Sequence, residues 1–141
     1  MTLALVPDAP EPFASDMQGA GFSPRVEDPD FIRRTRVMSF VHVATAMPID
    51  VFLAGSGLEE EFLDRAKVVD VGGTSVPFID VGDLIIAKVL AGRSKDVDDA
   101  SAVWRLHDQE MDANRIQRTL RLLEEALAQS ELVSTFEAKA R

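Results

Sequence analysis

The pattern of apolar and polar positions predicts short strands in the first part of the chain. Four runs are dominated by apolar residues, many of them β-branched or aromatic: "TLALV", "RVMSFVHV", "PIDVFL" and "KVVDV", at residues 2–6, 36–43, 48–53 and 67–71. Residues of these types are enriched in strands. The connection between the second and third runs is only "ATAM", which predicts that these two strands pair antiparallel. We therefore expect a small mixed sheet before residue 80.

Short helices are expected between these strands. The residues over 9–20 predict a weak helix, and helix formers over 57–66 predict another. Asp28 is suited to cap the segment "PDFIRRT", because its carboxylate can accept hydrogen bonds from the free N–H groups of a first helical turn. Pro29 then stands at the position of a helix where proline is favoured.

Helical periodicity takes over from residue 80. Asp80 is a suitable N-cap, with Asp83 three residues later as a weaker capping-box partner, and Gly92 is a natural end for the helix. Apolar residues recur at helical spacing in the segments that follow. Further helices are predicted over residues 95–107, 112–128 and 130–140.

The order of these elements predicts an α+β fold within a single domain, residues 1–141. The chain of 141 residues, 46% of them hydrophobic and 28% charged, is long enough to bury a core of its own. We expect a sheet-rich part over residues 1–79 and a helical part over residues 80–141.

The composition limits the chemistry that is available. The sequence contains no cysteine, which excludes disulfides, thiolate zinc sites and a cysteine nucleophile. His42 and His107 are its only histidines, so a histidine-rich metal site is also disfavoured. Any metal is therefore expected to be a hard cation held by carboxylates.

The net charge and the hydropathy of the chain disfavour two classes of binding partner, nucleic acid and membrane. The net charge of −9 disfavours a general coating of nucleic acid, which needs an excess of cations. Arg115, Arg118 and Arg121 follow one another at a spacing of three, which we interpret as a solvated helix face. No apolar run approaches the length of a membrane span, and the N-terminus lacks the features of a signal peptide. We expect a cytoplasmic protein with no membrane partner.

Asp50 is the first candidate functional residue. It stands in "PIDVFL", where strand alternation places it on the opposite face from Ile49 and Val51. Aspartate is depleted in strands, and a carboxylate there must be hydrated, paired or bound to a cation. Two interpretations stay open: a metal-binding or proton-accepting carboxylate, or a strand-end aspartate that pairs with an arginine or faces water.

The segment "IIAKVLAGRSKDVDDA" at residues 85–100 is the second candidate. Lys88 stands among apolar residues, so we expect a buried stem with the charge at the edge of a cleft. Lys95 follows seven residues later, and on one continuous helix both ammonium groups can reach one anion, such as a phosphate. In the structural alternative, Asp96 caps the next helix, Lys95 pairs with Asp99, and Lys88 extends to solvent.

Three stretches carry a family resemblance: "AGFSPR", "MPIDVFLAG" and "VPFIDVGDLIIAKVLAGRSKDVDDASAVW". Their order resembles the C-terminal two thirds of small bacterial proteins with the nucleotidyltransferase fold, including the toxin-type nucleotidyltransferases of toxin-antitoxin systems. The resemblance covers roughly residues 1–107, and "DLIIAKVLAGRSKDVDD" is its most specific part.

The resemblance implies a site for nucleotidyl transfer. In that family, an Asp-x-Asp pair that follows a Gly-Ser turn, together with a third carboxylate from a neighbouring strand, binds divalent metal, here expected to be Mg²⁺, which orients the nucleoside triphosphate. Asp50 matches the third carboxylate, which implies catalytic and metal-binding roles for it. The nucleotide-binding residues that the resemblance implies are Lys88, Arg93, Lys95, Asp96 and Asp99. Among these, Lys88 also counts as catalytic, the lysines are expected to contact the triphosphate, Arg93 is an optional contact, and the two aspartates are expected to orient the site.

The strand at residues 2–6 resembles the continuation of the strand that carries the Asp-x-Asp pair in the family, but no Gly-Ser turn and no Asp-x-Asp pair stand before it in the sequence. One carboxylate cannot hold two Mg²⁺ ions. Three explanations for the missing motifs stay open. The start of the chain is misassigned or truncated, the chain is a natural remnant, or it is a subunit that another chain completes.

We therefore expect transfer of a nucleotidyl group from a nucleoside triphosphate to an RNA or protein acceptor, impaired in the chain as written. The alternative is a catalytically inactive remnant that binds a nucleotide or a partner and acts as a homodimer. The site assignment requires the Asp50 carboxyl and the Lys88 amine to open into a common hollow between the sheet and the helices.

Overall fold

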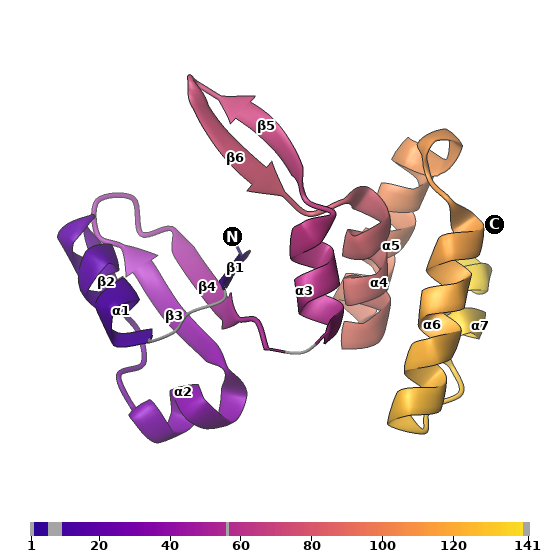
Figure 1. Ribbon diagram of the computed structural model, residues 1–141, viewed down its shortest axis with the longest axis horizontal. Coiled ribbons are helices and arrows are strands. Elements are labelled where there is room, and N and C mark those ends of the chain that lie inside the picture. Colours follow the sequence, from indigo (N-terminus) through magenta and orange to yellow (C-terminus); the bar gives the residue numbers. More distant parts are fainter. Residues whose placement is uncertain (1, 6–9, 56, 140–141) are drawn as a thin grey trace. The chain divides into compact units, whose positions relative to one another are not determined.

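The structure is a computed structural model that describes the backbone of residues 2–5, 10–55 and 57–139 (Figure 1). The chain forms two compact units, residues 1–64 and 65–141. The expectation of a single domain stays a prediction. The α+β fold class is confirmed, with sheets in the first part and a helical C-terminal half. Val6, Ala9 and Ala140, at the ends of predicted elements, lie outside the described residues.

The first unit contains the mixed sheet. Its strands are β1 Thr2–Leu5, β2 Phe22–Pro24, β3 Val37–His42 and β4 Pro48–Leu53. They lie in the order β1-β4-β3-β2, and β1 runs parallel to β4 while the other neighbours are antiparallel. The predicted antiparallel pair "RVMSFVHV" and "PIDVFL" is thus confirmed as β3 and β4.

Helices cover one face of this sheet. The helices of the unit are α1 Pro10–Gly19, α2 Pro29–Thr35 and α3 Gly57–Asp64. Side chains from α1 and α2 pack on a buried cluster formed by Met38, Phe40, Ile49 and Val51. Phe13 of α1 meets Phe40 edge to face, with ring centroids 6.3 Å apart. Because strand side chains alternate, residues between the core positions point to the other face of the sheet.

The helix starts follow the capping rules that the sequence indicates. Asp28 accepts a 2.9 Å hydrogen bond from the backbone N–H of Asp30 and caps α2, as predicted. At the other end of α2, Arg36 has a φ of 55°, and its guanidinium donates to the backbone oxygens of Leu53 and Ala54. These bonds fix the exit of β4 next to the end of α2.

The second unit consists of a hairpin and a helical bundle. The hairpin strands are β5 Lys67–Val71 and β6 Thr74–Phe78. The helices are α4 Val81–Ala91, α5 Ser94–His107, α6 Ala113–Leu127 and α7 Leu132–Lys139, with a short 3-10 turn at Asp108–Glu110. The buried side chains are mainly aliphatic: Ile85, Ile86, Val89, Ala100, Ile116, Leu120, Leu132 and Phe136. No helix of the described residues has the length and apolarity that crossing a bilayer requires.

The hairpin differs from the sequence prediction. "KVVDV" forms a strand as expected, but it pairs with β6 in a separate two-stranded sheet and does not join the main sheet. β6 itself was not predicted. Pro77 lies inside it, and proline argues against a strand unless that strand is at an edge, which both strands of a hairpin are.

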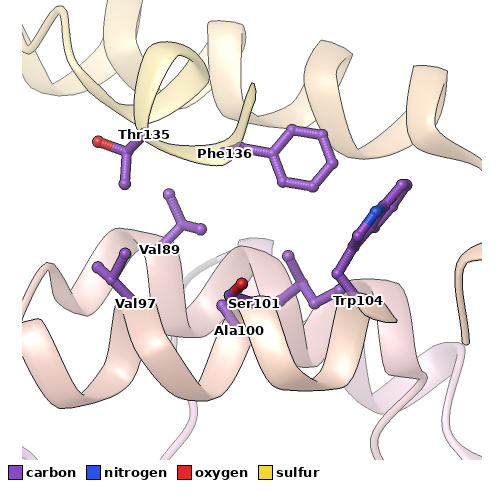
Figure 2. A pocket seen from close by; sticks show the side chains of 8 residues that line it. Val89, Val97, Ala100, Ser101, Trp104, Thr135 and Phe136 are labelled. Carbon is purple, nitrogen blue, oxygen red and sulfur yellow. The ribbon is translucent and has the colours of Figure 1, made fainter. Parts of the chain in front are cut away.

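The C-terminal helix closes the core of the bundle (Figure 2). Trp104 of α5 and Phe136 of α7 meet edge to face, with ring centroids 5.1 Å apart and planes at 86°. The space beside them is about 10 Å³, and Val89 and Val97 are among the side chains that line it. Such a volume holds at most one water molecule, so α4, α5 and α7 are closely packed there.

Candidate functional site

Asp50 lies on the face of the four-stranded sheet that is turned away from α1 and α2. Ile49 and Val51 point into the core, so alternation turns Asp50 outward, as predicted. Ser39 stands opposite it in the β3–β4 register and donates a 2.7 Å hydrogen bond to Asp50 Oδ1. The half-buried carboxylate is therefore oriented by a serine of the neighbouring strand.

Lys88 and Lys95 lie on two different helices, as the predicted helix end at Gly92 indicated, so the single continuous helix on which both could reach one anion does not form. α4 ends at Gly92, whose φ of 68° is a backbone conformation that favours glycine, and α5 begins at Ser94. Lys88 belongs to α4 and exposes 23% of its side chain, whereas Lys95 is exposed in the first turn of α5. The spacing of seven residues therefore does not place the two ammonium groups on one helix face.

The Lys88 ammonium pairs with carboxylates of α5. Lys88 Nζ lies 2.9 Å from Asp99 Oδ2 and 3.9 Å from Asp96 Oδ1. The partner of Asp99 is thus Lys88, and not Lys95 as the structural alternative supposed. Asp96 also accepts a hydrogen bond from the exposed Arg93, which outweighs the effect of burial and holds the pKa of Asp96 below its usual value. Lys88, Arg93, Asp96 and Asp99 are therefore brought together.

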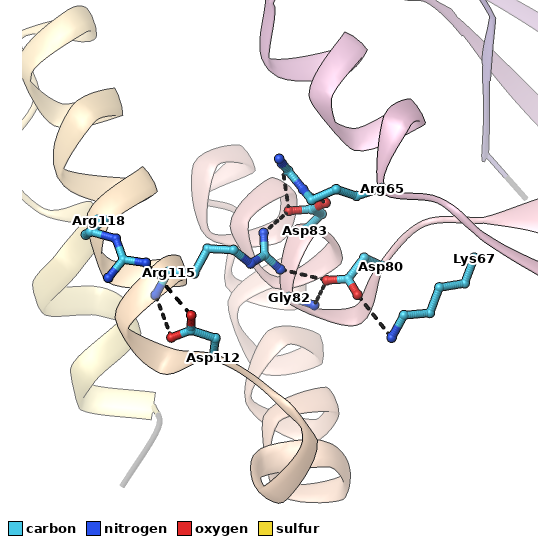
Figure 3. Close-up of polar contacts among 8 residues, drawn as sticks. All are labelled: Arg65, Lys67, Asp80, Gly82, Asp83, Asp112, Arg115 and Arg118. Atoms are coloured by element: carbon cyan, nitrogen blue, oxygen red, sulfur yellow. Dashed lines mark hydrogen bonds and ion pairs between the residues drawn. The ribbon is translucent and has the colours of Figure 1, made fainter.

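A second charged cluster, around Asp83, was not predicted (Figure 3). Asp83 is 0% exposed, although it stands in the first turn of α4. Arg65 donates to it at 2.8 and 3.2 Å, and Arg115 Nη1 lies 2.5 Å from its Oδ1. The interpretation of Arg115 as part of a solvated face is therefore wrong. The signal in the sequence was an aspartate at a core position of the apolar run "VGDLIIAKVL".

Asp80 extends this cluster at the start of α4. Its Oδ1 accepts the backbone N–H of Gly82 at 3.0 Å, which confirms it as the N-cap, and also Arg115 Nη2 at 2.7 Å. Its Oδ2 lies 3.2 Å from Lys67 Nζ at the base of the hairpin. A Cβ atom on Gly82 would overlap the Arg115 guanidinium, so any other residue there would make this guanidinium shift. The expected capping-box role of Asp83 is replaced by these ion pairs.

Acid is expected to weaken the fold through Asp80. Burial alone raises the pKa of Asp80, but the hydrogen bonds from Lys67 and Gly82 and the charge of Arg115 outweigh it and hold this pKa below its ordinary 3.8. A lowered pKa in the folded state stabilises the fold fully above the ordinary value, and this contribution is lost as the pH falls through the folded value.

Urea unfolding from about pH 6 down to about pH 3 measures this contribution. The Asp80→Asn variant keeps a good N-cap but loses the charge, so its stability should fall less steeply with acid than that of the wild type. Parallel profiles for the two proteins would show that Asp80 does not carry the effect.

Asp50 is the one residue that we predicted as a metal ligand, and it belongs to no cluster of three such side chains among the described residues. Within residues 10–55 and 57–139, no three Asp, Glu or His side chains are placed to hold one ion. Mg²⁺ bound with a triphosphate takes one or two carboxylates, phosphate oxygens and water. The Asp50 carboxylate, with the Ser39 hydroxyl beside it, fits one ion that arrives with a nucleotide. The described donor set does not fit a two-ion centre.

A cavity of the first unit lies on the opposite face of the sheet from Asp50. It has a volume of about 380 Å³, with Met38 and Phe40 on its floor and Glu11, Glu27 and Arg33 among its lining residues. Asp50 itself belongs to the first unit and Lys88 to the second. The common hollow that the site assignment requires therefore stays a prediction.

The comparisons with known proteins bear on both candidate regions. Residues 49–134 match the family described as "Nucleotidyl transferase of unknown function (DUF2204)". The match covers more than half of the chain, and it contains Asp50 as well as the segment from Lys88 to Asp99. No curated protein matches the sequence. The chain therefore belongs to this family of nucleotidyl transferases.

Proposed function

We propose that the protein binds a nucleoside triphosphate and transfers its nucleotidyl group to an RNA or protein acceptor. The observation that carries the proposal is the extent of the family match, which includes Asp50 of β4 and all of α4 and α5. In this reaction an acceptor oxygen forms a bond to the α-phosphorus, the bond from that phosphorus to the bridging oxygen breaks, and pyrophosphate leaves. The family membership supports the reaction class, and the residue roles below are part of the proposal.

Asp50 is the residue that we assign to the metal. A hydrogen bond from Ser39 holds Oδ1, so Oδ2 is the oxygen assigned to a divalent ion. Mg²⁺ is our choice of ion, because carboxylate, phosphate and water oxygens are the ligands that it prefers. When bound with the triphosphate, the ion would supply neutralisation of phosphate charge. Asp50 contributes the fixed carboxylate.

Lys88 is the residue that we assign to the triphosphate. Its ammonium already binds a carboxylate oxygen of Asp99 at 2.9 Å, and a phosphate oxygen can take the place of that oxygen. Asp96 and Asp99 are positioning residues for Lys88 in this scheme. Arg93 and Lys95 flank the start of α5, where free backbone N–H groups also attract anions, so both are assigned as further phosphate contacts.

Calorimetric titration of the full chain with ATP, GTP, CTP and UTP in Mg²⁺ tests these roles. We expect binding of at least one nucleotide. Lys88→Met should weaken it by about tenfold or more, because a charge-assisted hydrogen bond contributes about 1.5–3 kcal/mol. Asp50→Asn should weaken binding in Mg²⁺ and have a smaller effect when the metal is chelated.

Two control variants match these changes in charge. Asp16→Asn removes an exposed carboxylate of α1, and Arg121→Met removes an exposed cation of α6. Both should bind like the wild type. The site assignment fails if no nucleotide gives heat, or if Lys88→Met and Asp50→Asn bind as the wild type does while their circular dichroism shows an intact fold.

A second candidate function is binding of a nucleotide or a protein partner without transfer. It is favoured by one observation: the residues proposed for the site have partners within the protein, Asp50 with Ser39 and Lys88 with Asp99. Pyrophosphate release in the presence of RNA, or of a protein acceptor, separates the two functions. Nucleotide binding with no pyrophosphate released for any acceptor tested would favour the second.

A further inference from the structure

The β5–β6 hairpin exposes an apolar surface on a strand pair that is poorly covered. Figure 1 shows it extending away from helices α4 to α7 of the same unit. Val69, Val71 and Phe78 are 46%, 52% and 48% exposed. The register places these three on one face with Val76, because directly opposed residues point the same way. An isolated two-stranded hairpin is at best marginally stable in water, and three or more strands with a shared apolar face are needed for stability, so we expect further strands to join this hairpin.

The edge of β5 is the one that can accept another strand. Gly72 and Gly73 form a two-residue turn with positive φ at both positions, which makes Val71 and Thr74 a hydrogen-bonded closing pair. By alternation, the N–H and C=O groups of Val68 and Asp70 point away from β6.

The edge of β6 is blocked at one position. Pro77 stands opposite Val68 in the register and has no N–H to offer a further strand. Among the described residues of the hairpin, β5 is therefore the edge whose outward groups form an uninterrupted ladder.

Repulsion between carboxylates determines the register in which β5 of a second copy can pair with this edge. An antiparallel β5–β5 pair centred on Asp70 would put two carboxylates directly opposite, which is destabilising. Centred on Val69, the pair aligns all five residues Lys67–Val71 and places each Asp70 opposite the partner's Val68. This register uses both outward ladder positions of each strand. It also joins the two apolar faces on one side of a four-stranded sheet.

We propose that the protein forms a two-fold homodimer in which β5 pairs antiparallel with β5 of a second copy, centred on Val69. The hairpins then form a continuous β6-β5-β5-β6 sheet, and the apolar side chains of both copies lie on one face of it. Lys67 keeps its pairing with Asp80 at the hairpin base in this arrangement, because that contact lies within one chain. The dimer is independent of the proposed nucleotidyl transfer.

Cysteine substitution tests the register directly, because the natural chain has no cysteine. In the proposed dimer the two Val69 residues form a non-hydrogen-bonded pair with Cα atoms about 4.5 Å apart, a separation that a disulfide can span. Full-length Val69→Cys should therefore become a covalent dimer under mild oxidation. Ser75→Cys, at an exposed position of β6, should stay mostly uncrosslinked.

Sedimentation velocity of the unmodified chain is a second test of the dimer. We expect a reversible dimer, and Val69→Lys should shift it to monomer by placing two ammonium groups opposite each other. Val69 is half exposed, so this change should leave the fold intact, which circular dichroism checks.

Three outcomes would overturn the proposal. The first is a monomer at every concentration tested. The second is crosslinking of Ser75→Cys as fast as Val69→Cys. The third is a monomer in which the amides of Val68 and Asp70 exchange slowly with solvent, because another part of the same chain would then cover the edge.

Discussion

Replacing Asp83 with alanine is expected to lower the free energy of unfolding by about 3 kcal/mol, because it leaves two arginines without their shared buried partner. Asp83 is fully buried, and it receives hydrogen bonds from Arg65 and Arg115. The arginines expose 34% and 26% of their side chains, so water can solvate them in part. The loss should therefore lie at the lower end of the range for broken buried ion pairs.

Urea unfolding followed by circular dichroism measures this loss. Glu125→Ala, which removes an exposed carboxylate of the same unit, should change stability by no more than about 0.5 kcal/mol. In the double variant with Arg115→Met, the cost should be clearly less than the sum of the two single changes. Additive losses, or an Asp83→Ala variant as stable as the control, would contradict the role of this cluster.

Phe136→Ala is expected to cost about 3–5 kcal/mol, because it empties a site that is already closely packed. Phe136 is only 3% exposed, and its ring meets Trp104 edge to face (Figure 2). The space beside the two rings is small, so the side chains around Phe136 are closely packed in the unmodified protein. Collapse of α7 onto α5 can recover only a part of the lost contacts.

Thermal or urea unfolding checks this loss against Leu106→Ala, which truncates a leucine that is 78% exposed. That control should lie within about 0.5 kcal/mol of the wild type. Trp104 fluorescence gives a second readout, because removal of the neighbouring ring changes its environment. A small loss for Phe136→Ala, with unchanged fluorescence, would mean that α7 does not close the core as described.

The local elements could be predicted from the sequence because their signals are local. Asp28 and Asp80 both act as N-caps, and Gly92 ends α4 with a positive φ. Alternation in "PIDVFL" placed Asp50 correctly on the face away from the core. Each of these outcomes depends on residues within one turn or one strand, where capping and alternation act.

The long-range charge pairs could not be predicted in the same way. Asp83 and Arg115 are 32 positions apart, and neither identity nor spacing shows that helices α4 and α6 bring them together. The helical spacing of Arg115, Arg118 and Arg121 was equally typical of a solvated face.

The candidate site shows the same limit. The sequence singled out Lys88 and the charged segment after it, but neither interpretation paired Lys88 with Asp96 or Asp99. It gave the wrong partner for Asp99, because Gly92 ends the helix and α5 folds its first turns back against α4. Whether Asp50 and Lys88 act on one nucleotide depends on the arrangement of the two units. Capping and alternation are local signals and do not predict that arrangement.

The measurement that tests the proposed function most directly is an NMR titration of the full chain with the Mg²⁺ complex of the nucleotide that gives heat. We predict that the amide signals of Asp50 and Lys88 both shift, and that both shifts saturate along the same curve, because one bound nucleotide causes them. A shift at only one of the two residues, or different dissociation constants for the two, would contradict the account.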